Sequence, residues 1–127
     1  MDMADDPVPK RLRDFIARHI DSVAQLEALL LLHSNPAERW GIEPVANRLY
    51  IAPGESLEIL ERLCRDGLLS GENGVFQYDG AAPELRQIVD ELAQTYRRQL
   101  IPITILIHAK PRGIRAFADA FKIKRDK

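Results

Sequence analysis

The stretch LERLCRDGLLSGENGVFQY, residues 60–78, decides the fold class of this chain. Leu60 and Leu63 continue an apolar stripe at helical spacing, and Gly67 follows where a helix takes a left-handed C-terminal cap. Asn73-Gly74 then stands between two short β-prone runs, which is the strongest local signal for a β-hairpin. The stretch therefore predicts a helix that ends at Gly67, followed by a hairpin with strands at 68–70 and 75–78.

Three helices are expected between residue 21 and this hairpin. The first is apolar on most sides, with Asp21 or Ser22 as the candidate capping residue and a stop at Pro36. The second is separated from the third by the tight break Pro53-Gly54. Two short helices joined by a turn that contains glycine are typical of a helix-turn-helix unit. The expected helices span residues 22–33, 43–51 and 55–66, and the turn 37–41 carries Trp40 as an expected packing anchor.

This order of elements resembles the winged helix-turn-helix superfamily of bacterial transcription regulators. The resemblance is carried by Leu60-x-x-Leu63-x-x-x-Gly67-Leu68-Leu69 and the Asn73-Gly74 hairpin, and it covers roughly residues 22–78. It implies a mainly α fold with a small β component: a winged helix-turn-helix with a two-stranded wing, an N-terminal helix and a C-terminal helical extension. It also implies that residues 55–65 are the recognition helix, which in that superfamily enters the major groove of DNA.

The segments that flank this unit are expected to be helical. Residues 1–20 form a leader and a helix, 21–80 the winged domain, and 81–127 a long helix, a short terminal helix and a basic tail. We expect a kink or break at Pro102, because proline lacks the amide donor and clashes with the preceding turn. The apolar residues of this part exceed what a solitary helix can expose, so they must pack on the domain or on another chain, and a homodimer interface is the more economical expectation. These residues are Leu92, Tyr96, Leu100, Ile103, Ile107, Phe117 and Phe121.

Composition indicates one small globular domain. The 127 residues are 46% hydrophobic, which suffices for one core. The net charge of −1 gives no overall attraction to nucleic acid, so any such contact needs local patches. The single cysteine, Cys64, favours a reducing compartment and a cytoplasmic location. The apolar run 101–107 is far shorter than the ~20 residues that a membrane span needs, so no membrane association is expected.

Five residues are candidate DNA contacts on the two helices of the helix-turn-helix, and the hairpin tip is the candidate wing. The charge around them departs from that of a typical DNA-binding protein, because Glu55, Glu58 and Glu61 lie at outward positions of the recognition helix and residues 67–80 contain no lysine or arginine. Such carboxylates repel phosphate. The candidate contacts are Asn47, Arg48, Ser56, Arg62 and Arg65, with Asn73 and Gly74 in the wing; as an alternative, Arg62 and Arg65 pair with Glu58 and Glu61 at i, i+4.

The sequence contains no arrangement typical of an enzyme, and neither a metal nor another cofactor is expected. The three histidines are scattered over three segments, and Cys64 lies beside the apolar stripe of its helix, as expected of a structural thiol. The sequence therefore predicts a dimeric winged-helix regulator that binds double-stranded DNA. The alternative is a winged-helix module that binds a protein partner through its acidic helix and wing.

Overall fold

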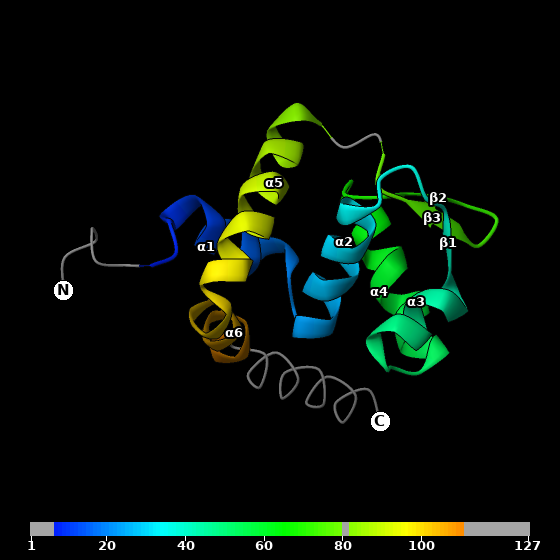
Figure 1. The fold of residues 1–127 in the computed structure, drawn as a ribbon, viewed down its shortest axis with the longest axis horizontal. Helices are drawn as coiled ribbons and strands as arrows, with labels where there is room; N and C mark the ends of the chain where they lie inside the picture. The colour runs from blue at the N-terminus through cyan, green and yellow to red at the C-terminus, as the bar shows by residue number, and fades with distance from the viewer. Residues whose placement is uncertain (1–6, 80–81, 111–127) are drawn as a thin grey trace, which may run out of the picture.

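The computed structural model describes residues 7–79 and 82–110, which form a mainly helical fold with a small antiparallel sheet (Figure 1). This confirms the expected fold class, an α+β arrangement like that of a winged helix. The elements in chain order are α1 (Lys10–His19), α2 (Val23–Ser34), β1 (Trp40–Gly41), α3 (Ile42–Leu49), α4 (Pro53–Arg65), β2 (Ser70–Glu72), β3 (Val75–Gln77), α5 (Pro83–Arg98) and α6 (Leu100–Ala109).

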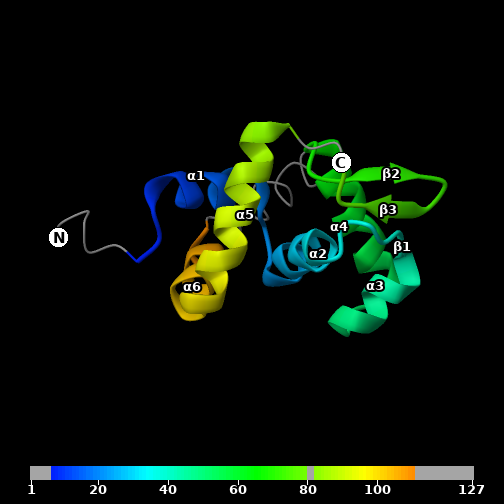
Figure 2. The ribbon, with the colours of Figure 1, turned by 45° about the horizontal axis from the view of Figure 1, so that its top comes forward.

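Helix α2 lies in the middle of the molecule. On one side α1 packs against α5 and α6, although these helices stand at opposite ends of the described chain (Figures 1 and 2). On the other side α3 packs against α4, and the sheet lies beside them. One continuous core therefore joins the N-terminal helix, the helix-turn-helix and the C-terminal helices.

Local signals explain where several elements begin and end. The Ser22 side chain accepts a hydrogen bond from the amide of Gln25 at 3.0 Å and caps α2. Gly67 has φ +80°, and the amide of Leu68 donates to the carbonyl of Leu63 at 2.9 Å. That 6→1 bond is the Schellman end of α4. Asn73 and Gly74 both have positive φ, as the type I′ turn of a two-residue hairpin requires.

The sheet has a third strand that the sequence did not predict. Strand β3 pairs with β2, as expected for a hairpin, and also with β1, where Trp40 faces Phe76 and Gly41 faces Val75. Residues 37–41 were expected to form a turn. A two-residue strand is too short to show an alternating pattern, so only its partner strand defines it. Trp40 is 5% exposed, which confirms its role in packing.

The break between α5 and α6 falls at Gln99, three residues before the expected position at Pro102. Gln99 leaves helical geometry with φ −126° and ψ 48°. A new helix then starts at Leu100, so Pro102 lies in its first turn, where a missing amide donor breaks no intrahelical bond. The chain thus accommodates the proline by starting a new helix just before it.

The structure corrects part of the expected dimer interface. Leu92, Ile103 and Ile107 are fully buried in the core of the single chain, because α5 and α6 turn these faces toward the other helices. Tyr96 is half-buried and donates its hydroxyl to Glu27 at 3.2 Å. Leu100 remains 52% exposed. The two other candidates, Phe117 and Phe121, lie outside the described residues.

Candidate interaction surface

The first turn of α4 is fixed to α3 by a buried serine. Ser56 has no exposed surface, and its hydroxyl donates to the carbonyl of Ile42 at 2.9 Å. This bond satisfies a polar side chain inside the helix-turn-helix and holds the two helices together. Ser56 was a candidate DNA contact. Its side chain is buried between the two helices, so it cannot contact the bases of a DNA groove.

The outer side of α3 carries two of the candidate contacts. Asn47 and Arg48 are both exposed. The Arg48 guanidinium lies 5.5 Å from the centroid of the Trp40 ring, within the range of a cation–π contact. This contact orients Arg48 at the junction of α3 and β1 while its surface stays accessible.

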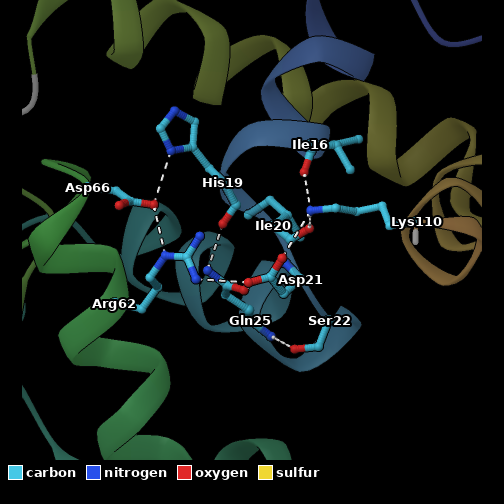
Figure 3. A network of polar contacts seen from close by, with 9 residues as sticks. All are labelled: Ile16, His19, Ile20, Asp21, Ser22, Gln25, Arg62, Asp66 and Lys110. Carbon is cyan, nitrogen blue, oxygen red and sulfur yellow. Dashed lines mark hydrogen bonds and ion pairs between the residues drawn. The ribbon is translucent and has the colours of Figure 1, made fainter. Parts of the chain in front are cut away.

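Arg62, near the C-terminal end of α4, is bound inside a network of charges (Figure 3). Its guanidinium donates to Asp21 at 2.9 Å and to Asp66 at 3.3 Å. Asp66 also lies 3.1 Å from Nδ1 of His19. These contacts replace the alternative pair with Glu58, because Asp21, between α1 and α2, and Asp66, directly after α4, both lie within reach of the guanidinium.

The same network holds the end of α6. The Lys110 ammonium donates to the carbonyls of Ile16 and Ile20 at 3.1 and 2.5 Å and to Asp21 at 3.0 Å (Figure 3). Its side chain is only 8% exposed, and three acceptors match its three donors. Asp21 thus joins Lys110 to Arg62, and the network ties α6 to α1, α2 and α4. We interpret these charges as structural, so the guanidinium of Arg62 is engaged by carboxylates of the fold, although its side chain is one-third exposed.

The exposed side of α4 is acidic. Glu55, Glu58 and Glu61 follow one another along it, and we call these three residues the acidic stripe. Within residues 7–79 and 82–110 they take part in no hydrogen bond or ion pair. Arg65, the last residue of α4, is exposed beyond them. Three carboxylates therefore face solvent where a DNA-binding helix would present cations or amides.

A shallow hollow separates the C-terminal half of α4 from the hairpin. Its charged lining consists of Glu61 and Arg65 from α4 and Glu72 from β2, and the turn residues Asn73 and Gly74 complete its rim. Two carboxylates and one guanidinium leave this hollow with a net negative charge. The predicted wing residues thus border an acidic site, which disfavours phosphate.

Cys64 lies in the same hollow and fills space against the hairpin. A Cβ at Gly71 would approach the Phe76 ring to 2.8 Å and the Cys64 sulfur to 2.9 Å, so a glycine lets β2 pass close to α4. Burial raises the pKa of the Cys64 thiol, and the charge of Glu61 raises it further. A raised thiol pKa disfavours the reactive thiolate, in agreement with a packing role.

Tyr50 was not among the candidate site residues and lies within the range of the expected helix 43–51. Helix α3 instead ends at Leu49, and Tyr50 follows in the left-handed region with φ 59° and its side chain 94% exposed. Glycine is the usual residue at such a position, because a Cβ there costs roughly 1–2 kcal/mol. An exposed aromatic residue thus stands in a strained position at the turn of the helix-turn-helix.

The part of the chain that the structure describes contains no group of three or more His, Cys, Asp or Glu side chains placed to hold a metal ion. Among the same residues, no helix is both long and apolar enough to span a bilayer. Comparisons with models of protein families, with curated proteins and with solved structures found no match. What this fold binds is therefore inferred from its surface.

Proposed function

We propose that this protein is a winged-helix interaction module that binds a basic surface of a partner protein through the acidic stripe and the hairpin. The observation that carries the proposal is the row of three exposed glutamates on α4, which have no hydrogen bond or ion pair among residues 7–79 and 82–110. Charges of one sign at the rim of an interface accelerate association with a surface of opposite sign and select against other partners. The acidic stripe is already exposed beside the hairpin, so it can attract a basic surface without a change in the fold.

The contacts that Ser56 and Arg62 make within the fold also support the proposal. Both were candidate contacts to DNA, and both side chains are bound within the fold. A duplex is bound mainly by cations that neutralise its phosphates, and an affinity of this kind falls steeply with salt. Arg48 and Arg65 remain as exposed candidate contacts to phosphate. The three glutamates of the acidic stripe lie between them in the sequence and repel phosphate. This charge balance favours a basic partner protein over a duplex.

DNA binding by a dimeric regulator stays the second candidate. Asn47, Arg48 and Arg65 are exposed, and the helix-turn-helix order of α3 and α4 is the feature that favours it. As part of either proposal we place the protein in the cytoplasm, since its single cysteine suits a reducing compartment. We also propose a non-enzymatic role, because the charged side chains of the fold form structural pairs or solvated rows.

A photo-crosslinking residue at Asn73, in the turn beside the acidic stripe, tests the proposal in cells. We expect a protein adduct that is lost in Glu55→Lys/Glu58→Lys and retained in Glu38→Lys/Glu84→Lys. The second pair of exposed glutamates is the matched control, because it changes the net charge equally outside α4. An adduct that survives both pairs of substitutions would contradict a role for the stripe.

A gel-shift titration against mixed genomic fragments separates the two candidates. The proposal expects no shift at low salt, and Glu55→Lys/Glu58→Lys is the positive control that should gain weak, salt-sensitive binding. A shift by the unaltered protein that weakens steeply with salt and is lost in Arg48→Ala would support the regulator instead.

A further inference from the structure

One side of helix α2 carries leucines that the fold covers only in part. Residues 23–34 are apolar around most of the helix, a pattern typical of a helix that is covered on all sides. Leu30 and Leu31 are nevertheless only partly buried, and Glu27 and Ser34 beside them are exposed. These four residues occupy positions i, i+3, i+4 and i+7, which form one face of a helix. We call them the open face of α2.

A groove lies on the open face of α2, between α3 and α5. Helix α2 packs against both of these helices and lies between them (Figures 1 and 2). The groove has a volume of about 420 Å³, which accommodates a few side chains of a bound molecule. Beside the open face, its lining includes Arg48 and Leu49 from α3 and Ala93, Tyr96 and Arg97 from α5.

The groove combines aliphatic surface with cations that have no carboxylate partner. Leucines of α2 and α3 supply the aliphatic surface. Arg48 and Arg97 are exposed, and neither guanidinium takes part in a hydrogen bond or ion pair within residues 7–79 and 82–110. The contact of Arg48 with the Trp40 ring leaves its N–H donors unoccupied. Glu27, the one carboxylate among the described lining residues, accepts the Tyr96 hydroxyl at 3.2 Å.

We propose that this groove binds an amphipathic helix of a partner protein, whose aliphatic side chains cover the leucines and whose aspartate or glutamate residues pair with Arg48 and Arg97. Guanidinium groups bind carboxylates through two parallel N–H donors. A helix suits the groove, because an amphipathic helix presents aliphatic anchors at i, i+3, i+4 and i+7 to a groove of this kind. A nucleic acid would match the arginines but would leave the leucines without an apolar partner.

This inference concerns a different surface from the proposed function and does not depend on it. The acidic stripe lies on α4, whereas the groove is formed by α2, α3 and α5. The two surfaces differ in the charge that they select, because the stripe attracts basic ligands and the two arginines attract acidic ones. The composition of a bound peptide therefore distinguishes one surface from the other.

Selection from a displayed library of random peptides tests the proposal, with the full chain as bait. Peptides of about 16 residues are long enough to form a helix. We expect the enriched peptides to have aliphatic residues at helical spacing with aspartate or glutamate beside them. Glu55→Gln/Glu58→Gln, which removes charge from the acidic stripe, should enrich the same peptides. A selection that yields only basic peptides, or none with this pattern, would overturn the proposal.

A charge swap with one enriched peptide tests the role of the arginines. Measured by fluorescence anisotropy, Arg48→Glu/Arg97→Glu should raise Kd at least about tenfold, and lysines in place of the peptide's acidic residues should restore binding to this variant. Arg18→Glu/Arg39→Glu is the matched control, because it changes the net charge equally at exposed positions outside the groove. It should alter Kd less than about twofold. Circular dichroism verifies that both variants stay folded. Equal losses in the two variants would contradict the proposal.

Photo-crosslinking determines where the peptide binds. Ser34 is exposed and lines the groove, so a photo-reactive residue in its place should capture the peptide. The same residue at Gln87, which is exposed on α5 outside the groove, should not. Equal capture at both positions would overturn the proposal. A cross-linked dimer of the chain that excludes the peptide would also overturn it, in favour of a second copy as the occupant.

Discussion

Charged side chains at the C-terminal end of α4 form ion pairs, whereas those along its exposed side do not among the described residues. At the C-terminal end Arg62 and Asp66 are bound to each other, to Asp21 and to His19, with side chains no more than about one-third exposed. Along the exposed side Glu55 and Glu58 face solvent and have no such contacts among residues 7–79 and 82–110. Partnered charges hold a fold together, whereas an unpartnered row of one sign is available to another molecule.

The largest loss of stability is expected from a substitution on the buried side of α4. Leu60 is fully buried, so Leu60→Ala should lower the free energy of unfolding by about 2–5 kcal/mol through lost burial and the cavity left behind. Urea denaturation followed by circular dichroism measures this loss. Leu57→Ala on the same helix is the control and should cost less, because Leu57 is only partly buried. A loss below about 1 kcal/mol at Leu60 would conflict with its place in the core.

At the partnered end, Arg62→Glu should place a third carboxylate beside Asp21 and Asp66. We expect the free energy of unfolding to fall by about 1–2 kcal/mol, a value reduced for the partial exposure of the arginine. The same substitution at Arg65, which is exposed, should change it by less than about 0.5 kcal/mol. Denaturation curves of both variants check the difference, and equal losses would mean that the network contributes nothing.

At the turn before α4, Tyr50→Gly should raise stability. Glycine adopts φ 59° without a steric penalty, and after its greater entropy in the unfolded chain is allowed for, we expect a gain of about 0.5–1 kcal/mol. Asn73→Gly is the matched control, since asparagine tolerates the left-handed region better and should gain less. Thermal unfolding measures both. A destabilised Tyr50→Gly would show that the exposed ring contributes to the fold.

The smallest effect is expected on the acidic stripe itself. Glu58→Gln should change the free energy of unfolding by less than about 0.5 kcal/mol, because its carboxylate has no partner to lose among the described residues. Asp66→Asn should cost about 1 kcal/mol, because it weakens the contacts with Arg62 and His19. If both variants lost the same stability, the two parts of α4 would not differ as we infer.

Several elements were predictable because their signals are local. Ser22, Gly67 and Asn73-Gly74 act within a few residues of themselves, through a cap, a left-handed helix end and a tight turn. Other outcomes depended on distant segments. Strand β1 exists through its pairing with β3, and Ile103 and Ile107 are buried because α6 folds back onto α1. Helical periodicity marks a face as apolar but does not say what covers it.

The candidate site residues also fall into two groups, those whose exposure the sequence predicted and those whose partners are distant in the sequence. The sequence identified Asn47, Arg48 and Arg65, which are exposed, and the acidic character of α4. It also proposed Ser56 and Arg62, whose partners Ile42 and Asp21 lie 14 and 41 residues away. The exposure of Tyr50 had one available signal, the lack of a glycine where α3 must turn sharply.

The sequence by itself determined the order of helices, the hairpin turn, the single core and the acidic charge of α4. Each of these features follows from residue types and from their spacing over a short stretch of sequence. Only the tertiary structure decided which charges are internal, because an ion pair such as Arg62 with Asp21 forms where packing brings two helices together. For the same reason it alone decided that α6 buries Ile103 and Ile107 and leaves Leu100, Ile101 and Ile105 exposed.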